Sequence, residues 1–386
     1  MIMNRLGRML VGVLILVSQT GCWDMKTIQD TNYFTAIGFD FQKGHYIVYA
    51  QMLDFSSVAK QEAGKAGQPP QIWVGREEGA TVNEAFNRLY KTTQQRVFWG
   101  HVSAYLFSSE ALKQGISKFM DGSVRYSETR FTQWIYSTDE SIEAIFSVVP
   151  FFNVSPMASI LMNPIENYHQ LSYIRPFRLY RVAALLREPG YTLMMPNLSI
   201  QEDTWKKSQK PDPKLEVNGV YAIGKNNLVE WFSYNQFKGD RWMEKSSARS
   251  PLVVYMNGKP VQTVSVERPK PHIRLRKDSN QIFDVHMKCK VITIESLERA
   301  DEASLQKQIE KQIAEEIEQT FKMAKDRGVD IYQLEHNLYR QDFKLWAKLT
   351  LNGKHSLEDY ELGDVRVDVQ LTHSGMLRER VKDQQY

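Results

Sequence analysis

The sequence predicts a mixed α/β (α+β) protein made of three sheet-and-helix domains in tandem. Three observations lead to this prediction: strands and helices alternate up to about residue 200, strand patterns dominate from residue 215, and a long amphipathic helix follows them. The chain has 386 residues, of which 42% are hydrophobic, which is ample for packed cores. At roughly 150 residues for each domain, this length fits two or three domains.

The first residues have the pattern of an export signal. Arg5 and Arg8 precede an apolar run at residues 9–17, and a short polar stretch then leads to Cys22. A basic start, an apolar stretch and a small residue before the cleavage point are typical of a secretory signal peptide, which we predict over residues 1–21. The apolar run is too short to span a bilayer, because spanning takes about 20 residues.

A cysteine directly after the small residue Gly21 indicates a bacterial lipoprotein, in which Cys22 becomes the first residue of the mature chain. The predicted lipidation site is therefore Cys22, as an S-diacylglycerol and N-palmitoyl cysteine, and the predicted partner is membrane lipid. Two or more acyl chains anchor a protein stably, whereas one chain binds only marginally. The signal departs from the usual pattern at Gln19, where leucine or a similar residue is normal.

Charge and cysteine content argue against several other classes of protein. The whole chain has a net charge of +4, and loss of residues 1–21 removes two arginines and leaves +2. A nearly neutral body gives no reason to expect a nucleic-acid partner. Cys22 and Cys289 are the two cysteines of the chain, so acylation of Cys22 would leave no partner for a disulfide.

Cys289 lies in an alternating run with Val285, Met287 and Val291, so we expect it to face the core as a small hydrophobic side chain. His286 precedes it by three residues. A single His-x-x-Cys pair is too small a ligand set for zinc, which takes about four ligands. No metal or other cofactor is therefore predicted.

An N-terminal α/β domain is expected over residues 22–200. Two strands around a turn at Lys43 and Gly44 form a hairpin, and a loop rich in glycine and proline follows at residues 56–70. Thr81 and Glu84 form a capping-box pattern at the start of a helix. The expected strands are at 33–40, 45–55, 96–107 and 131–137, and the expected helices are at 81–91, 109–120 and 141–149.

A middle, mostly β domain is expected over residues 215–266, after a linker at 201–214 that contains four lysines and two prolines. A C-terminal α/β domain is expected over residues 267–378. The predicted strands of these two domains are at 215–223, 228–232, 251–255, 261–266, 273–276, 282–294 and 365–371.

The longest predicted helix spans residues 296–327, within the C-terminal domain. Its apolar residues recur at a spacing of four and form one broad stripe: Leu305, Ile309, Ile313, Ile317 and Phe321. This pattern favours an amphipathic helix packed on the C-terminal sheet over a coiled coil, in which the spacing alternates between three and four. The acidic pair Glu315 and Glu316 is expected on the solvated face.

No catalytic residues are predicted. Ser57 and Lys60 match the S-x-x-K motif of serine acylases, with partial matches at residues 233–235 and 373–375. That chemistry needs the serine and lysine one turn apart on a helix, whereas Ser57 leads into the glycine- and proline-rich loop. His101, after an apolar strand, is interpreted as a core or turn residue.

Two basic clusters, at residues 206–210 and 268–277, have two interpretations. They could contact anionic lipid headgroups, where each basic residue contributes on the order of 1 kcal/mol near the membrane surface. The preferred interpretation is that they are solvated loops between domains.

Several motifs follow one another along the chain and are specific when taken together. They are G-C-W-D at 21–24, A-I-G-F-D at 36–40, E-G-A-T-V-N-E-A at 78–85, W-G-H at 99–101, the hairpin sequence at 218–229, and the segments at 330–332, 344–346 and 372–375. Over almost all of the mature chain, this series resembles the Ger(x)C spore germination lipoproteins.

The resemblance implies the C subunit of a nutrient germinant receptor, with three mixed α/β domains, no enzyme activity and no cofactor. Such subunits are anchored by lipid to a cell membrane, the spore inner membrane. They sit on its outer face beside the integral membrane subunits A and B. They are required for germination in response to nutrients. Two functions stay open: a tethered interaction and assembly module, or a solute-binding lipoprotein that itself captures a small-molecule germinant or transport substrate.

Overall fold

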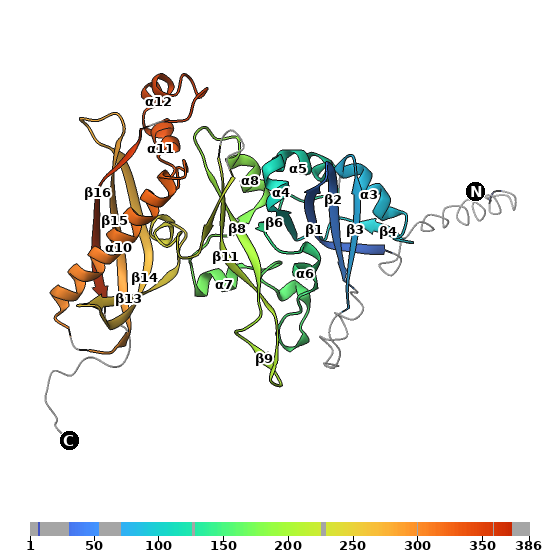
Figure 1. Cartoon of the computed structure of the whole chain (residues 1–386), viewed down its shortest axis with the longest axis horizontal. Helices are drawn as coiled ribbons and strands as arrows, with labels where there is room; N and C mark the ends of the chain where they lie inside the picture. The colour runs from blue at the N-terminus through green and yellow to red at the C-terminus, as the bar shows by residue number, and fades with distance from the viewer. Residues whose placement is uncertain are drawn as a thin grey trace.

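The computed structural model describes residue 7 and residues 31–53, 71–125, 128–224, 229–298, 300–357 and 359–372. These residues form a mixed α+β protein with two large sheets and helices packed against both, which confirms the predicted fold class. Figure 1 shows the two sheets side by side along the longest axis of the molecule.

The first sheet is built from strands between residues 31 and 233. Its order is β12-β11-β8-β6-β5-β1-β2-β3, with β4 paired to β1 and β7 paired to β6. Strands β8, β6, β5 and β1 run parallel, and the strands toward both edges are antiparallel to their neighbours. The strands are β1 (Thr31–Gln42), β2 (His45–Leu53), β3 (Ile72–Gly79), β4 (Arg96–Phe98), β5 (Ala104–Ser108), β6 (Trp134–Thr138), β7 (Phe177–Arg178), β8 (Leu193–Gln201), β11 (Lys214–Ile223) and β12 (Val229–Ser233).

Helices cover both faces of the first sheet, because its central strands alternate apolar side chains between two cores. On β5, Tyr105 and Phe107 enter one core, and Ala104 and Leu106 enter the other. Side chains of α3, α4, α5 and α8 complete the first core, and those of α6 complete the second. The helices are α3 (Val82–Tyr90), α4 (Ser109–Gln114), α5 (Ile116–Val124), α6 (Ile142–Ser147), α7 (Ile165–Gln170) and α8 (Leu179–Leu185).

Several observed elements differ from the prediction. The expected strand at 96–107 is two strands, β4 and β5, which both pair with β1. The expected helix at 109–120 is divided into α4 and α5 at Gly115, whose φ of 95° favours glycine. Strands β3 and β8 were not predicted.

The linker predicted at residues 201–214 is wrong. Strands β8 and β11 are antiparallel neighbours that pair from Gln201 and Lys214 onward. The residues between them form a hairpin of β9 (Lys206–Lys207) and β10 (Lys210–Pro211). The lysines and prolines therefore belong to an exposed hairpin that extends from the sheet. The prediction failed because an exposed hairpin and a linker have the same composition.

The second sheet has the order β13-β14-β15-β16, in which β16 alone runs parallel to its neighbour. Its strands are β13 (Arg249–Met256), β14 (Lys259–Leu275), β15 (Ile282–Ser296) and β16 (Glu361–Thr372). The strands expected in a middle domain over 215–266 are divided between the sheets: β11 and β12 end the first, and β13 and β14 begin the second. The division follows from the length of β14, which continues past residue 266 and pairs with β15 along most of its course.

The long helix α10 (Glu302–Lys325) packs on the second sheet, as the apolar stripe predicted. The five stripe residues are all buried, and they share a core with Val264, Val291 and other strand residues. Gly328, with a φ of +71°, follows the helix in the conformation that favours glycine. The short helices are α9 (Asp240–Met243), before the second sheet, and α11 (Leu334–Gln341) and α12 (Phe343–Leu349), between α10 and β16.

Candidate functional site at the junction of the two sheets

The junction between the two sheets has a continuous apolar core. Met194, Val220 and Phe232 of the first sheet belong to the same buried cluster as the apolar stripe of α10. Trp242 of α9 belongs to this cluster as well and is fully buried. The two sheets are therefore packed through shared side chains and not merely connected by the chain.

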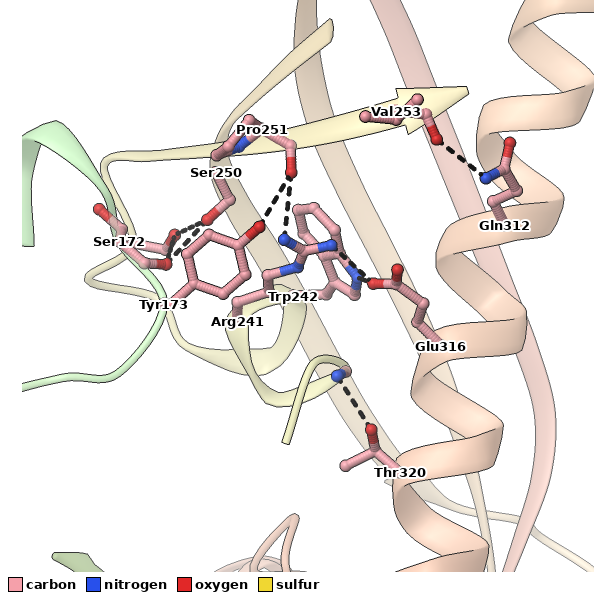
Figure 2. A network of polar contacts seen from close by, with 12 residues as sticks. Ser172, Tyr173, Arg241, Trp242, Ser250, Pro251, Val253, Gln312, Glu316 and Thr320 are labelled. Atoms are coloured by element: carbon pink, nitrogen blue, oxygen red, sulfur yellow. Dashed lines mark hydrogen bonds and ion pairs between the residues drawn. The ribbon is translucent and has the colours of Figure 1, made fainter. Parts of the chain in front are cut away.

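Arg241 of α9 is the centre of a polar network at this junction (Figure 2). Its Nη2 lies 2.8 Å from Oε2 of Glu316 on α10, and the same oxygen accepts a hydrogen bond of 2.8 Å from Nε1 of Trp242. Nη1 donates to the carbonyl of Pro251 at 3.1 Å. The guanidinium also lies over the rings of Tyr173 and Trp242, at 4.4 and 4.1 Å. Because the Arg241 side chain is only 3% exposed, this is a buried ion pair.

Ser172 joins the chain after α7 to the start of β13, at the upper left of the same network (Figure 2). Its carbonyl accepts a hydrogen bond of 2.8 Å from Oγ of Ser250. Its own Oγ accepts the backbone N–H groups of Ala248 and Arg249, at 3.0 and 3.2 Å. One buried serine therefore satisfies several backbone groups that strand pairing leaves without partners at this point.

A second polar contact joins α11 to the loop before β8. Gln333 accepts a hydrogen bond from the N–H of Thr192 and donates one to its carbonyl, both at 2.7 Å. Nδ1 of His336 lies 3.0 Å from the carbonyl of Pro189. At Gly190, whose φ is +68°, an added Cβ would lie 2.5 Å from Cγ of Glu335, so both conformation and space select glycine there.

Two neighbouring cavities share Ile174 in their linings; the first is lined from the side of the first sheet, and the second is lined from both sides of the junction. The first has a volume of about 560 Å³ and is lined by four tyrosines together with apolar and asparagine side chains. These tyrosines are Tyr136, Tyr168, Tyr173 and Tyr234. The second has a volume of about 500 Å³ and a more polar lining. Both volumes are in the range of small-molecule sites.

The second cavity contains charged groups of both signs. Arg175 makes two contacts of 3.1 Å with the carboxylate of Glu244. Burial raises the pKa of Asp240 well above its usual range, Glu244 raises it further, and Arg175 opposes the shift. The lining therefore holds an Arg175–Glu244 ion pair beside Asp240, a carboxyl whose protonated form burial favours.

The cysteine and the two histidines weighed as candidate site residues do not form a common site. Cys289 is 6% exposed within the core of the second sheet, as expected, and burial raises the pKa of its thiol to about 12. His286 lies on the opposite face of β15, where Nε2 is 2.7 Å from Asp368. His101 lies in an exposed turn, with its ring centroid 4.9 Å from that of Tyr33.

Other predicted features fall outside the described residues: the signal peptide at residues 1–21 except residue 7, Cys22, the Ser57 and Lys60 motif, and residues 373–375. Within the described ranges, no three His, Cys, Asp or Glu side chains gather as a metal site. No helix in the same ranges is both long enough and apolar enough to cross a membrane.

Glu316 corrects one prediction. Glu315 is 48% exposed, as expected of a solvated face, but Glu316 is 22% exposed and binds Arg241. The reason is its position on the helix, since Glu316 lies three residues after the buried Ile313 and borders the apolar stripe. That spacing was the available signal in the sequence, whereas no pattern pointed to Arg241.

Two family models match the chain, and between them they include nearly all of both sheets. Residues 24–200 match "Spore germination protein N-terminal domain", and residues 218–375 match "Spore germination B3/ GerAC like, C-terminal". The chain belongs to the Ger(x)C family of spore germination proteins. The family resemblance seen in the sequence is thus confirmed.

Curated relatives of this Ger(x)C protein include two from Bacillus subtilis (strain 168). Spore germination protein KC is 22% identical and is matched over 97% of both chains. Spore germination protein B3 is 20% identical over 73% of this chain and 72% of its own. The crystal structure of the GerBC protein has a TM-score of 0.54 and 13% sequence identity, over 86% of this chain and 96% of that one. At this identity, the structural likeness supports the fold alone.

Proposed function

We propose that this Ger(x)C protein is a lipid-anchored, non-enzymatic subunit of a spore germinant receptor. In this proposal it serves as an interaction and assembly module on the outer face of the spore inner membrane. The observation that carries the proposal is the position of Cys22. The family match begins at residue 24, directly after an export-type segment that ends in Gly21 and Cys22.

The proposed partners are membrane lipid, through acylated Cys22, and the integral membrane subunits A and B of the receptor. A diacylglyceryl group and an N-palmitoyl group would together supply three chains, which exceeds the two signals needed for stable anchoring. Anchoring confines a protein to a plane and raises its effective concentration against membrane partners. A rigid body with a shared core, such as the junction provides, suits a module that holds partners in fixed positions.

The test is substitution of Cys22→Ala in the sporulating organism, with Cys289→Ala as the matched control. The first variant should leave the membrane fraction and impair germination in response to nutrients. The control should stay in that fraction, because Cys289 is buried in the core and takes no part in acylation. Membrane retention and a normal nutrient response of Cys22→Ala would disprove the anchoring proposal.

The second cavity supports an alternative function, capture of a small-molecule germinant or transport substrate by this subunit itself. Its volume of about 500 Å³ and its charges of both signs fit a zwitterionic solute such as an amino acid. Calorimetric titration of amino acids into the unacylated chain tests this alternative. Saturable binding that Glu244→Gln abolishes would favour it, and absence of heat across the series would reject it.

A further inference from the structure

Two segments that are far apart in the sequence form one exposed surface beside the hairpin β9–β10. Phe152, in a short 3₁₀ turn after α6, is 91% exposed, and Trp205 at the start of the hairpin is 52% exposed. The ring of Phe151 lies edge-on to that of Trp205, with centroids 4.9 Å apart. Figure 1 shows the hairpin around β9 as the lowest projection of the first sheet, close to α6.

We call this surface the hairpin patch and define it by its aromatic, apolar and basic members: Phe151, Phe152, Val154, Trp205, Lys206, Lys207 and Lys210. Large exposed apolar side chains that gather in one place mark contact sites on soluble proteins. Phe152 has a φ of 57°, a conformation that bulky residues rarely adopt. The most exposed ring of the patch therefore sits on a strained backbone conformation.

The charges of the hairpin are distributed unevenly. Lys206, Lys207 and Lys210 form its tip, with no acidic residue between 204 and 211. The acidic residues Glu202, Asp203 and Asp212 lie nearer the sheet, and Asp212 is paired with Lys214 at 2.7 Å. The tip is therefore a cationic surface next to exposed aromatic rings.

We propose that the hairpin patch docks onto the headgroup region of an anionic lipid bilayer. Phenylalanine and tryptophan rings are suited to the membrane interface, where an apolar body meets polar headgroups. Lysines next to them are attracted by the negative surface potential of anionic lipids. The aromatic rings and the lysines lie on one surface, so a single partner must match both. An anionic lipid surface does so, since it buries the rings at its interface and complements the charge of the lysines.

This inference rests on the proposed lipid anchor in one respect, which is the nearness of a bilayer. Cys22 lies nine residues before Thr31, the first residue of β1, and nine extended residues reach about 30 Å. An anchored chain could therefore bring the body of the protein against the membrane. Docking of the patch would add a second contact and restrict the orientation of the whole molecule.

The experiment uses the mature chain with Cys22→Ser, which cannot be acylated, and sedimentation with vesicles. Vesicles of equal parts phosphatidylglycerol and phosphatidylcholine should bind it, and vesicles of phosphatidylcholine alone should bind it much more weakly. The triple variant K206Q/K207Q/K210Q should partition on the order of 100-fold less onto the anionic vesicles, since each lysine contributes about five-fold. The variant F152S/W205S should weaken binding to both vesicles.

The matched control is K307Q/K311Q/K322Q, which removes three exposed lysines from α10 and should leave vesicle binding unchanged. Circular dichroism of every variant checks that it is folded. Equal vesicle binding by the unacylated wild-type chain and both patch variants would overturn the proposal. If the patch variants nevertheless slowed germination, the patch would contact protein and not lipid. This experiment can fail independently of the anchoring test. If the unacylated chain does not bind vesicles while membrane retention still depends on Cys22, the docking of the patch is rejected and the anchor is not.

Discussion

At the scale of single residues, the junction depends on one carboxylate that lies between two donors. Glu316 accepts hydrogen bonds from Arg241 and Trp242, both at 2.8 Å. Neutralising one partner of a buried pair leaves the other charge without compensation, which costs far more than losing an exposed pair. Its neighbour Glu315 forms only an exposed contact with Lys311, at 3.7 Å.

Glu316→Gln should therefore lower the free energy of unfolding by about 3 kcal/mol. Glu315→Gln, one residue away on the same helix, should change it by no more than about 0.5 kcal/mol. Urea unfolding followed by circular dichroism measures both. Equal effects of the two substitutions would show that the junction ion pair contributes nothing beyond a surface contact.

Asp330 is a second carboxyl with an unusual environment. Burial raises its pKa to about 7, and nearby Glu335 adds to the shift, although the N–H groups of Leu334 and Glu335 donate to it, each at 2.8 Å. The pKa is raised in the folded state, so the unfolded chain loses this proton first as pH rises. Protonated Asp330 stabilises the folded state, and this stabilisation is fully present below the ordinary pKa of 3.8. It is lost as pH rises through about 7.

The free energy of unfolding of wild type, relative to that of Asp330→Asn, should fall by up to about 4 kcal/mol between pH 4 and pH 7. Above that range the difference should be constant, because Asp330 is then ionised in both states. Chemical unfolding of the two proteins at several pH values gives this difference. A flat profile would mean that Asp330 is already ionised in the folded protein near pH 4.

At the scale of elements, sequence patterns succeed where local chemistry and burial agree. Oγ1 of Thr81 accepts the N–H of Glu84 at 3.1 Å, so the predicted cap of α3 is confirmed. Glu84 reaches back to the N–H of Ala80, at 2.8 Å, and not to that of Thr81 as in a full capping box. The stripe of α10 was equally readable, since a spacing of four brings its residues onto one face.

Thr81→Ala should destabilise α3 and lower the free energy of unfolding by about 1 kcal/mol, because the first-turn N–H groups lose their acceptor. Thr204→Ala, at an exposed position before Trp205, is the control and should have little effect. Hydrogen exchange of the α3 amides, with thermal unfolding alongside, measures the change. Unaltered exchange in Thr81→Ala would show that tertiary packing alone holds this helix.

The elements that were missed share a different property: their pairing is decided outside their own sequence. β8 contains Pro196, which normally argues against an inner strand because proline cannot donate to the ladder. Here β8 lies between β6 and β11, but its pairing with β6 is confined to Ser137 and Asn197, so the missing donor is tolerated. β3 is an edge strand with Trp73 60% exposed, and its apolar alternation is correspondingly weak.

At the scale of the whole molecule, the two sheets are one structural unit. Met194, Val220 and Phe232 of the first sheet pack in the same core as α10, and the networks of Arg241, Ser172 and Gln333 cross the same boundary. Side chains in a common core lose their contacts together.

The unacylated protein should therefore unfold in a single transition by calorimetry, with calorimetric and van't Hoff enthalpies that agree. Gly190→Ala should lower the transition temperature, because its Cβ would collide with Glu335 and open the junction. Two well-separated transitions in the wild-type protein would show that each sheet with its helices is an independent domain.

The α+β class, the capped helix, the amphipathic helix on the second sheet and the membership in the Ger(x)C family could all be inferred from the residues alone. Each depends on residues close together in the chain or on ordered motifs, and such information is local. Cys22 also stands out from sequence alone, through the order of basic, apolar and small residues before it. Folding alone brings together the strands of each sheet, buries Glu316 but not Glu315, and sets Phe151 against Trp205 of the lysine-rich hairpin. These depend on contacts between segments far apart in the chain, whose geometry no local pattern encodes.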